Sequence, residues 1–347
     1  MKLGLFIGYS GAQVRLPVET AQQAERLGYD SVWTAEAYGS DAVTPLAYLA
    51  AKTDRIRLGT GIMQMPARTP ATTAMTMSTL DQLAGGDRVI IGLGLSGPQV
   101  VEGWHGQPWG SPVKRTREYV EILRKMLARE EPVTYDGDEY QLPYHGPGSS
   151  GLGKPLKSIL HMKPLPIYLA TLGPANVKTT AELADGWLPM WFSPQRMDVF
   201  RPWLEEGFAR AGNGKGYDNF EIQPACNVIV NDDVQECFRQ MKPNVALYMG
   251  GMGARGKNFH NDVIVRYGYG DVAARIQELY LGGQRAEALE AVPDELCDEI
   301  SLVGPADRIR ERYRIWEDSG ITALSVQTQD PVAIELMADI TGASRGG

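Results

Sequence analysis

Apolar residues along the chain follow two alternating spacings. Short apolar, β-branched runs typical of buried strands are each followed by a stretch with apolar residues three or four positions apart, as in a helix. The predicted strands are 2–9, 30–35, 56–63, 88–95, 166–170, 186–190, 220–230, 299–303 and 321–327. The predicted helices are 17–27, 44–52, 70–83, 114–129, 175–184, 194–211, 232–248, 305–319 and 331–341.

Repeated strand–helix units predict a parallel sheet that is covered by helices. Eight or nine units over 347 residues favour a closed (β/α)8 TIM barrel, which is an α/β fold, over an open sheet. We expect a single domain over 1–347 because such barrels routinely exceed the usual domain length.

Two glycine-rich stretches are longer than plain connections, so we expect insertions at about 142–157 and 249–297. The first is interpreted either as an ordered surface excursion or as a lid. The second begins MGGMGARGKN, and its four glycines favour a lid whose backbone can approach a ligand closely.

Charge and composition exclude several classes of partner. The net charge of −8 has the wrong sign for a non-specific nucleic-acid binder. No apolar run approaches the roughly 18 residues of a membrane helix, so we expect no membrane partner. The odd number of cysteines, without a CxxC pair, favours the reducing cytoplasm. The four histidines lack metal-ligand spacing, so no protein-held metal is expected.

One apparent dinucleotide fingerprint is rejected. Residues 92–97, GLGLSG, match GxGxxG after a strand, but the fingerprint should open a helix in the first strand–helix unit. Here it lies in the fourth unit and runs into Pro98 and a predicted loop. We interpret the segment as a barrel strand whose glycines let a planar ligand lie against the backbone at the carboxyl-terminal mouth.

Segments along nearly the whole chain together resemble one superfamily. They are MKLGLFIGY, AERLGYDSVWTAEAYGSDAVTPLAYLAAKTDRIRLGTGI, ARTPATTAMTMSTLDQLAGGDRVIIGLGLSGPQVVEGWHG, TLGPANVKTTAELADGWLP and YMGGMGARGKNFH. The sequence resembles the bacterial luciferase-like superfamily, and the last two segments resemble its branch of oxidoreductases that depend on the deazaflavin coenzyme F420. The resemblance implies a (β/α)8 barrel, often with insertions after strand seven.

The resemblance also implies where the cofactor lies. It places a non-proline cis peptide, Gly61-Ile62, behind the deazaflavin ring, although an ordinary strand is the alternative. It places the cofactor phosphate on the turn formed by Thr171, Gly173, Pro174 and Asn176. That site is also physically reasonable, because free N–H groups and the helix dipole bind a phosphate without a lysine. A capped helix that faces water is the alternative.

Polar residues at strand ends are further candidates, because the carboxyl ends of barrel strands point into the active site. Thr34 and Glu36 end the second predicted strand, and Ser96 ends the fourth. Relatives often carry a histidine beside the acidic residue, whereas this chain has Ala37. Glu36 is therefore interpreted as a proton donor if burial raises its pKa, as a residue that orients the ring, or as half of a salt bridge.

Two histidines, His260 and His105, are alternative proton donors, although a lone histidine is more often structural. Tyr9 and Trp104, with further aromatic residues near the mouth, are expected to contact a flat apolar substrate, although each taken alone is more often a core residue. Arg255 and Lys257 are candidate partners for the anionic tail of F420, or else a solvated loop tip. FMN would need no tail site.

The function that we expect is hydride transfer between C5 of the deazaflavin and a small, flat, apolar organic substrate at the barrel mouth. The alternatives are an FMN-dependent luciferase-like monooxygenase and a cofactor-binding barrel without catalytic activity, which the missing histidine supports. By resemblance to the family we expect a homodimer.

Overall fold

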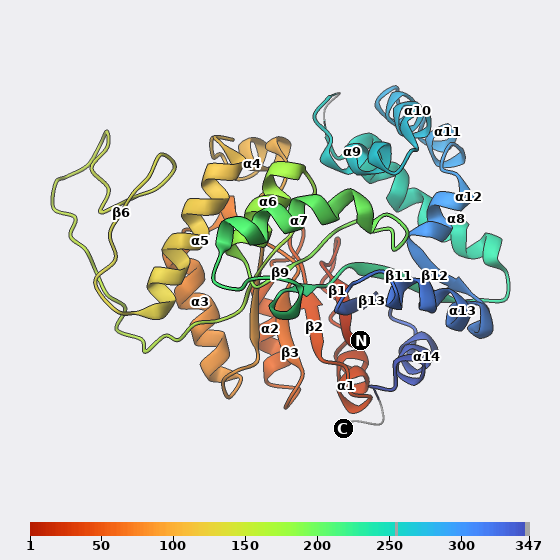
Figure 1. The fold of residues 1–347 in the computed structure, drawn as a ribbon, viewed down its shortest axis with the longest axis horizontal. Helices are drawn as coiled ribbons and strands as arrows, with labels where there is room; N and C mark the ends of the chain where they lie inside the picture. Colours follow the sequence, from red (N-terminus) through yellow and green to blue (C-terminus); the bar gives the residue numbers. More distant parts are fainter. Residues whose placement is uncertain (254–255, 344–347) are drawn as a thin grey trace.

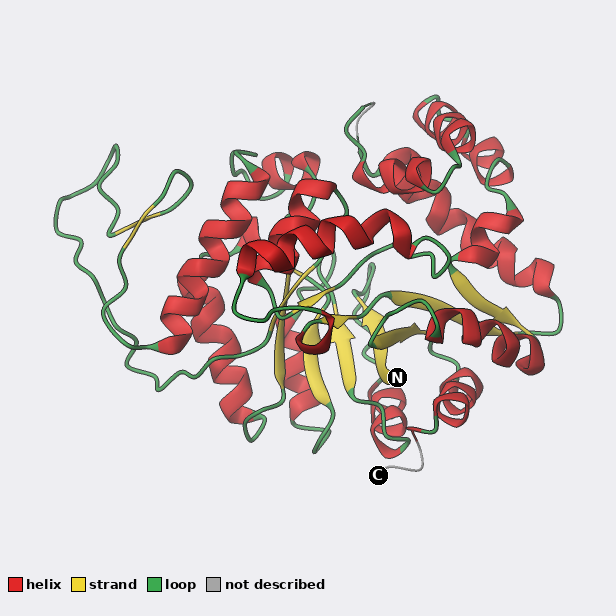
Figure 2. Ribbon diagram, viewed as in Figure 1, coloured by secondary structure: helices red, strands yellow, loops and turns green. Residues whose placement is uncertain are grey.

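Eight parallel strands form the wall of a barrel in the computed structural model, which describes residues 1–253 and 256–343. Figures 1 and 2 show the strands at the centre of the molecule with helices around them. In chain order the wall consists of β1 (Lys2–Gly8), β2 (Ser31–Thr34), β3 (Arg57–Thr60), β5 (Val89–Gly94), β8 (Ile167–Leu169), β9 (Gly186–Trp187), one segment that contains both β10 (Glu221–Ile222) and β11 (Ala225–Val230), and β13 (Ala323–Gln327).

The sheet closes through the segment 221–230. Its first half, β10, pairs with β9, and its second half, β11, pairs with β13, which in turn pairs with β1. The N–H of Thr322 also donates to the carbonyl of Ile222 at 3.0 Å. The predicted (β/α)8 barrel is therefore confirmed. A ninth strand, β12 (Ser301–Gly304), pairs with the outer side of β11, and the short β4 (Met63–Gln64) pairs with β5.

The helices occupy the predicted segments to within a few residues at each end. They are α1 (Val18–Arg26), α2 (Val43–Ala50), α3 (Pro70–Leu83), α5 (Pro112–Ala128), α6 (Pro174–Leu183), α7 (Met197–Ala211), α8 (Val234–Ala246), α13 (Ala306–Glu317) and α14 (Pro331–Thr341). Local chemistry sets several boundaries. For example, Thr69 caps α3 by accepting from the N–H of Thr72, and Pro70 occupies the first helical position.

The short helix α4 (Pro98–Gly103) follows Gly97 and is not among the predicted helices, whereas the predicted loop GWHGQPWGSP is present over 104–111. Gly97 has an extended backbone, Pro98 supplies the first helical position, and Val101 is fully buried. The dinucleotide interpretation still fails, because the strand before α4 belongs to a closed barrel rather than to an open sheet.

The glycines of β5 have different roles. A Cβ on Gly92 would lie 1.7 Å from the carbonyl oxygen of Thr60, so this glycine permits β3 and β5 to approach each other. The expectation that it makes room for a ligand is therefore wrong. Gly94 faces the side chain of Ile62 and lines the cavity described below.

The first insertion is a surface excursion. An arm, residues 134–157, carries the hairpin of β6 (Tyr135–Asp136) and β7 (Gln141–Leu142) and extends away from the barrel beyond α5 (Figure 1). A bridge between Val133 and Leu156 closes its base.

The second insertion is mostly helical and lies beside α8 (Figure 1). After α8 a π-helical turn covers Leu247–Gly251. It is followed by α9 (Phe259–Arg266), α10 (Gly270–Leu281), α11 (Arg285–Glu290) and α12 (Asp294–Glu299). Arg255, a predicted cofactor-tail residue, lies outside the described residues.

Candidate active site

A cavity of about 1320 Å³ opens at the carboxyl ends of the barrel strands. Ligand pockets usually measure about 300–1,000 Å³, so this one has room for a cofactor and a substrate together. It receives most of the residues expected to contact a ligand: Tyr9, Glu36, Gly61, Ile62, Ser96, Trp104, Thr171, Gly173, Asn176 and His260.

Two expected cofactor contacts do not line this cavity in the described structure. Thr34 is buried, and its hydroxyl donates to the carbonyl of Ala42 at 2.6 Å. Pro174 occupies the first position of α6, where a missing N–H costs nothing. Both residues support neighbours that do reach the cavity.

The peptide bond between Gly61 and Ile62 is cis, as the resemblance implied. The N–H of Gly61 donates to the carbonyl of Thr34 at 2.6 Å, and the N–H of Glu36 donates to the carbonyl of Ile62 at 3.1 Å. The cis unit is therefore tied to the end of β2 and lies on the cavity wall beside Glu36. Contact with a cofactor ring stays a prediction.

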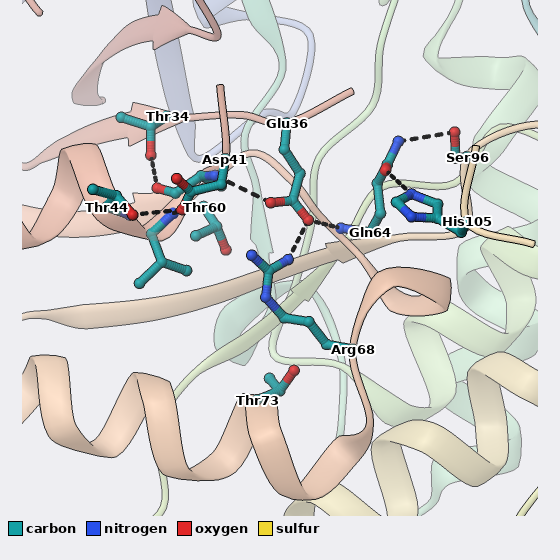
Figure 3. A network of polar contacts seen from close by, with 12 residues as sticks. Thr34, Glu36, Asp41, Thr44, Thr60, Gln64, Arg68, Thr73, Ser96 and His105 are labelled. Carbon is teal, nitrogen blue, oxygen red and sulfur yellow. Dashed lines mark hydrogen bonds and ion pairs between the residues drawn. The ribbon is translucent and has the colours of Figure 1, made fainter. Parts of the chain in front are cut away.

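Glu36 is the acceptor at the centre of the network in Figure 3. One carboxylate oxygen accepts from the N–H of Gln64 at 2.8 Å and from the guanidinium of Arg68. The other accepts from the N–H of Ala42 at 3.1 Å. Three donors, one of them charged, suit an ionised carboxylate. The geometry thus favours the salt-bridge alternative, and proton donation by Glu36 stays a prediction.

Gln64 connects this network to the other side of the cavity (Figure 3). Its amide nitrogen donates to the hydroxyl of Ser96 at 3.0 Å, and its amide oxygen lies 2.7 Å from Nε2 of His105. Because an amide oxygen only accepts, His105 must carry a hydrogen on Nε2. Sequence reasoning missed Gln64 and Arg68, since nothing in their local pattern marks residues whose partners lie just after β2, β5 and α4.

The turn before α6 is fixed from inside the barrel. The indole N–H of Trp187 donates to the carbonyl of Thr171 at 2.9 Å, and the hydroxyls of Thr171 and Thr180 lie 2.8 Å apart. The first backbone bond of the helix runs from the N–H of Val177 to the carbonyl of Gly173. The N–H groups before Val177 are therefore available for a ligand.

This turn fits a group that carries both a phosphate and hydroxyls. A Cβ on Gly173 would meet no atom within 4 Å, so the space beside the turn is open. The side-chain oxygen of Asn176 is buried without a hydrogen-bond partner in the described structure, so it can accept from a ligand hydroxyl or from a water. The helix N-terminus supplies the positive potential that a phosphate needs.

His260 enters the cavity from α9. Its Nδ1 accepts a hydrogen bond from the indole N–H of Trp191 at 3.2 Å, and the ring of Tyr248 lies edge-on at 4.9 Å between centroids. Burial lowers the pKa of His260 to about 4. The ring is therefore neutral at physiological pH, and its role as proton donor stays a prediction.

Charge is sparse on the cavity wall. Among the described residues that line it, Glu36 is the one acidic side chain, and no lysine or arginine lines it. Lys257 is exposed on the second insertion, and its contact with an anionic tail stays a prediction.

Other chemistry is also limited within the described part of the chain. It has no cluster of three metal-ligating side chains, and no helix long and apolar enough to cross a membrane. Cys226, Cys237 and Cys297 are buried as free thiols.

Comparison with known proteins agrees with this geometry. The family model described as luciferase-like monooxygenase matches residues 1–323. The chain belongs to this family. Over 329 residues it is 49% identical to a Mycobacterium tuberculosis protein provisionally named a coenzyme F420-dependent oxidoreductase, with 94% of each chain covered.

Solved structures share the fold of this family member. The coenzyme F420-dependent tetrahydromethanopterin reductase of Methanopyrus kandleri superposes with a TM-score of 0.77 over 97% of each chain, at 23% identity. An F420-dependent secondary alcohol dehydrogenase, solved with an F420–acetone adduct, superposes with a TM-score of 0.76 over 99% of each chain, at 20% identity. The family resemblance and the fold deduced from the sequence are both confirmed.

Proposed function

We propose that this luciferase-like protein is an F420-dependent oxidoreductase that transfers hydride between C5 of the deazaflavin and a small, flat, apolar organic substrate. The observation that carries the proposal is the open turn before α6. It presents free N–H groups, an empty space at Gly173 and the unpaired oxygen of Asn176 to a cavity large enough for two ligands. The similarity to a protein named for the same coenzyme supports it.

Some residues would hold the cofactor phosphate, and others would orient its ring. The turn at Gly173 and Asn176 would hold the phosphate and a hydroxyl. Gly61 and Ile62 would support one face of the flat ring, and Ser96 would border it. The network of Glu36 and Arg68 keeps the end of β2 in place beside that face. The bound coenzyme supplies hydride chemistry and reacts poorly with oxygen, whereas the protein supplies position and a sheltered pocket.

The substrate would stack on the open side of the ring, between the cavity wall and the rim. Tyr9 and Trp104 line the cavity and are 40% and 66% exposed, so a ligand could still cover both. A flat apolar body would bury these aromatic faces. We also expect a homodimer in the cytoplasm, which light scattering and cell fractionation would check.

An FMN-dependent monooxygenase remains the second candidate, because FMN also carries a phosphate and hydroxyls that the same turn could hold. A cofactor-binding barrel without turnover is the third. Cofactor preference separates the first two, and reduction or oxidation of the bound coenzyme separates the third.

The test is a fluorescence-quenching titration of purified apoprotein with F420 and, separately, with FMN. We expect low-micromolar or tighter binding of F420 and much weaker binding of FMN. A preference for FMN would move the protein to the monooxygenase class. Tight F420 binding, with no hydride donor or acceptor that changes the deazaflavin absorbance, would support the barrel without turnover.

A further inference from the structure

The contact between Trp191 and His260 fixes which ring nitrogen carries the hydrogen. An indole nitrogen can only donate, so Nδ1 of His260 must be the acceptor in the 3.2 Å contact. In the neutral ring the hydrogen then lies on Nε2. That nitrogen has no hydrogen-bond partner among the residues that the structure describes, although the side chain lines the cavity.

Contacts with its neighbours fix the position of Trp191. Its φ of 59° lies in the left-handed region, which bulky residues rarely adopt and which marks positions fixed by their surroundings. Its carbonyl accepts from the hydroxyl of Tyr267 at 2.9 Å, and its side chain is nearly buried. Its ring also packs against Tyr248, 5.4 Å away between centroids.

The charge of the cavity wall selects against anionic substrates. Glu36 offers an anion no attraction, and the guanidinium of Arg68 is already paired with Glu36. No lysine or arginine lines the cavity within the described part of the chain. The N-terminus of α6 can take an anion, but the cofactor phosphate occupies that site in the proposed function. Among the residues that the structure describes, a carboxylate or phosphate on the substrate would therefore find no cation on the cavity wall to replace its water.

We infer that the substrate is an uncharged carbonyl or hydroxyl compound with a flat apolar body, whose oxygen accepts a hydrogen bond from Nε2 of His260. This inference rests on the proposed function and narrows its substrate class. His260 is then the residue that contacts the substrate oxygen, and Trp191 is a positioning residue that sets its tautomer. A neutral imidazole on Nε2 donates a hydrogen bond while keeping its proton, so proton exchange with the substrate is left to water at the open mouth.

The first test compares two ligands of nearly equal shape. The protein saturated with F420 is titrated with 2-acetylnaphthalene, a flat ketone, and with 2-naphthoate, the corresponding carboxylate, and binding is followed by ligand-observed NMR. We expect the ketone to bind at least tenfold more tightly. Equal affinities, or tighter binding of the naphthoate, would overturn the inference without any variant.

The second test uses variants of the two residues. His260→Phe removes the donor and is expected to weaken ketone binding about tenfold, whereas His260→Gln retains an N–H donor and should recover part of the loss. His145→Gln on the exposed arm is the matched control. Unchanged ketone affinity in His260→Phe would overturn the contact.

The tautomer can be measured directly in the apoprotein. Nitrogen-15 NMR of the histidine side chains should show His260, assigned by its loss in His260→Gln, with its hydrogen on Nε2. Trp191→Phe should give a mixture of tautomers, whereas Trp203→Phe, which removes an indole on α7, should change nothing. A hydrogen on Nδ1 in the wild-type protein would overturn the role of Trp191.

The design separates failure of this inference from failure of the proposed function. If F420 does not bind, the proposed function is wrong. If F420 binds tightly but the carboxylate is preferred over the ketone, the proposed function stands and the inference about the substrate is wrong.

Discussion

His260 makes the stability of the protein depend on pH. Burial lowers its pKa from 6.5 to about 4 in the folded state. Between these values the unfolded chain binds a proton that the folded chain does not, so stability is fully present above pH 6.5 and falls as the pH drops toward 4. The pKa difference corresponds to at most about 3 kcal/mol, and exposure of the ring to the cavity lowers this value.

The prediction is tested by urea unfolding of the wild type and of His260→Gln between pH 4 and 7. As the pH falls, the wild type should lose unfolding free energy relative to His260→Gln, because Gln does not titrate. His145→Gln should follow the wild type. A difference that is independent of pH would show that His260 titrates normally in the folded protein.

Glu36 and Arg68 form a pair that we expect to stabilise the end of β2. Glu36→Gln leaves the guanidinium without its carboxylate, and we expect it to lower the unfolding free energy by about 3 kcal/mol, since both side chains are largely buried. Arg68→Met should cost a similar amount. Urea unfolding should show that the double variant loses less than the sum of the two.

Turnover distinguishes the roles left open for Glu36. With a salt-bridge role, Glu36→Gln should lower stability and cofactor affinity while the bound enzyme keeps most of its turnover. A loss of turnover that far exceeds the loss of affinity would instead identify Glu36 as the proton donor.

At the scale of the element, the turn before α6 can be altered without disturbing the fold. Gly173 has a φ of −86° and open space at its Cβ position, so valine is compatible with the backbone. In Gly173→Val the added methyl groups occupy the space where the phosphate would approach the N–H groups. We expect F420 affinity to fall tenfold or more, about 1.4 kcal/mol, in the quenching titration.

Gly216→Val is the control, because Gly216 also has open space but does not line the cavity. Both variants should retain the wild-type unfolding midpoint. Unchanged F420 affinity in Gly173→Val would mean that the phosphate binds elsewhere.

The sequence predicts the elements well because their signals are local. The β5 segment is apolar at nearly every position, and Thr69 followed by Pro70 marks the start of α3. The turn at Gly173 is equally local, since an apolar strand, a glycine and a proline lie in succession. The predictions fail at residues whose role depends on contacts with distant parts of the chain. Gly92 is required by the carbonyl of Thr60, and Gln64 and Arg68 acquire their function from partners on distant elements.

At the scale of the whole molecule, the insertions differ in their relation to the cavity. The second insertion supplies Gly251, Met252, Phe259 and His260 to the wall. No described residue of the arm lines it. The barrel and the second insertion therefore form the site together, whereas the arm is attached at one side (Figure 2).

Removal of the arm should therefore leave both the barrel and the site intact. Leu142 pairs with Tyr135, and Leu156 bridges to Val133, so the two ends of the segment 143–154 lie near each other. A four-residue Gly–Ser linker in place of this segment spans the gap, and shortening a loop lowers the entropy cost of closing it.

We expect the thermal midpoint to stay within about 3 °C, since a shift of that size corresponds to roughly 1 kcal/mol. F420 affinity should stay within about twofold, because no described residue of the arm lines the cavity. A twofold change is far below the 1.4 kcal/mol of a tenfold change in affinity. Loss of affinity in the shortened protein would instead show that the arm closes over the cavity, and a change of mass in light scattering would show that it joins two subunits.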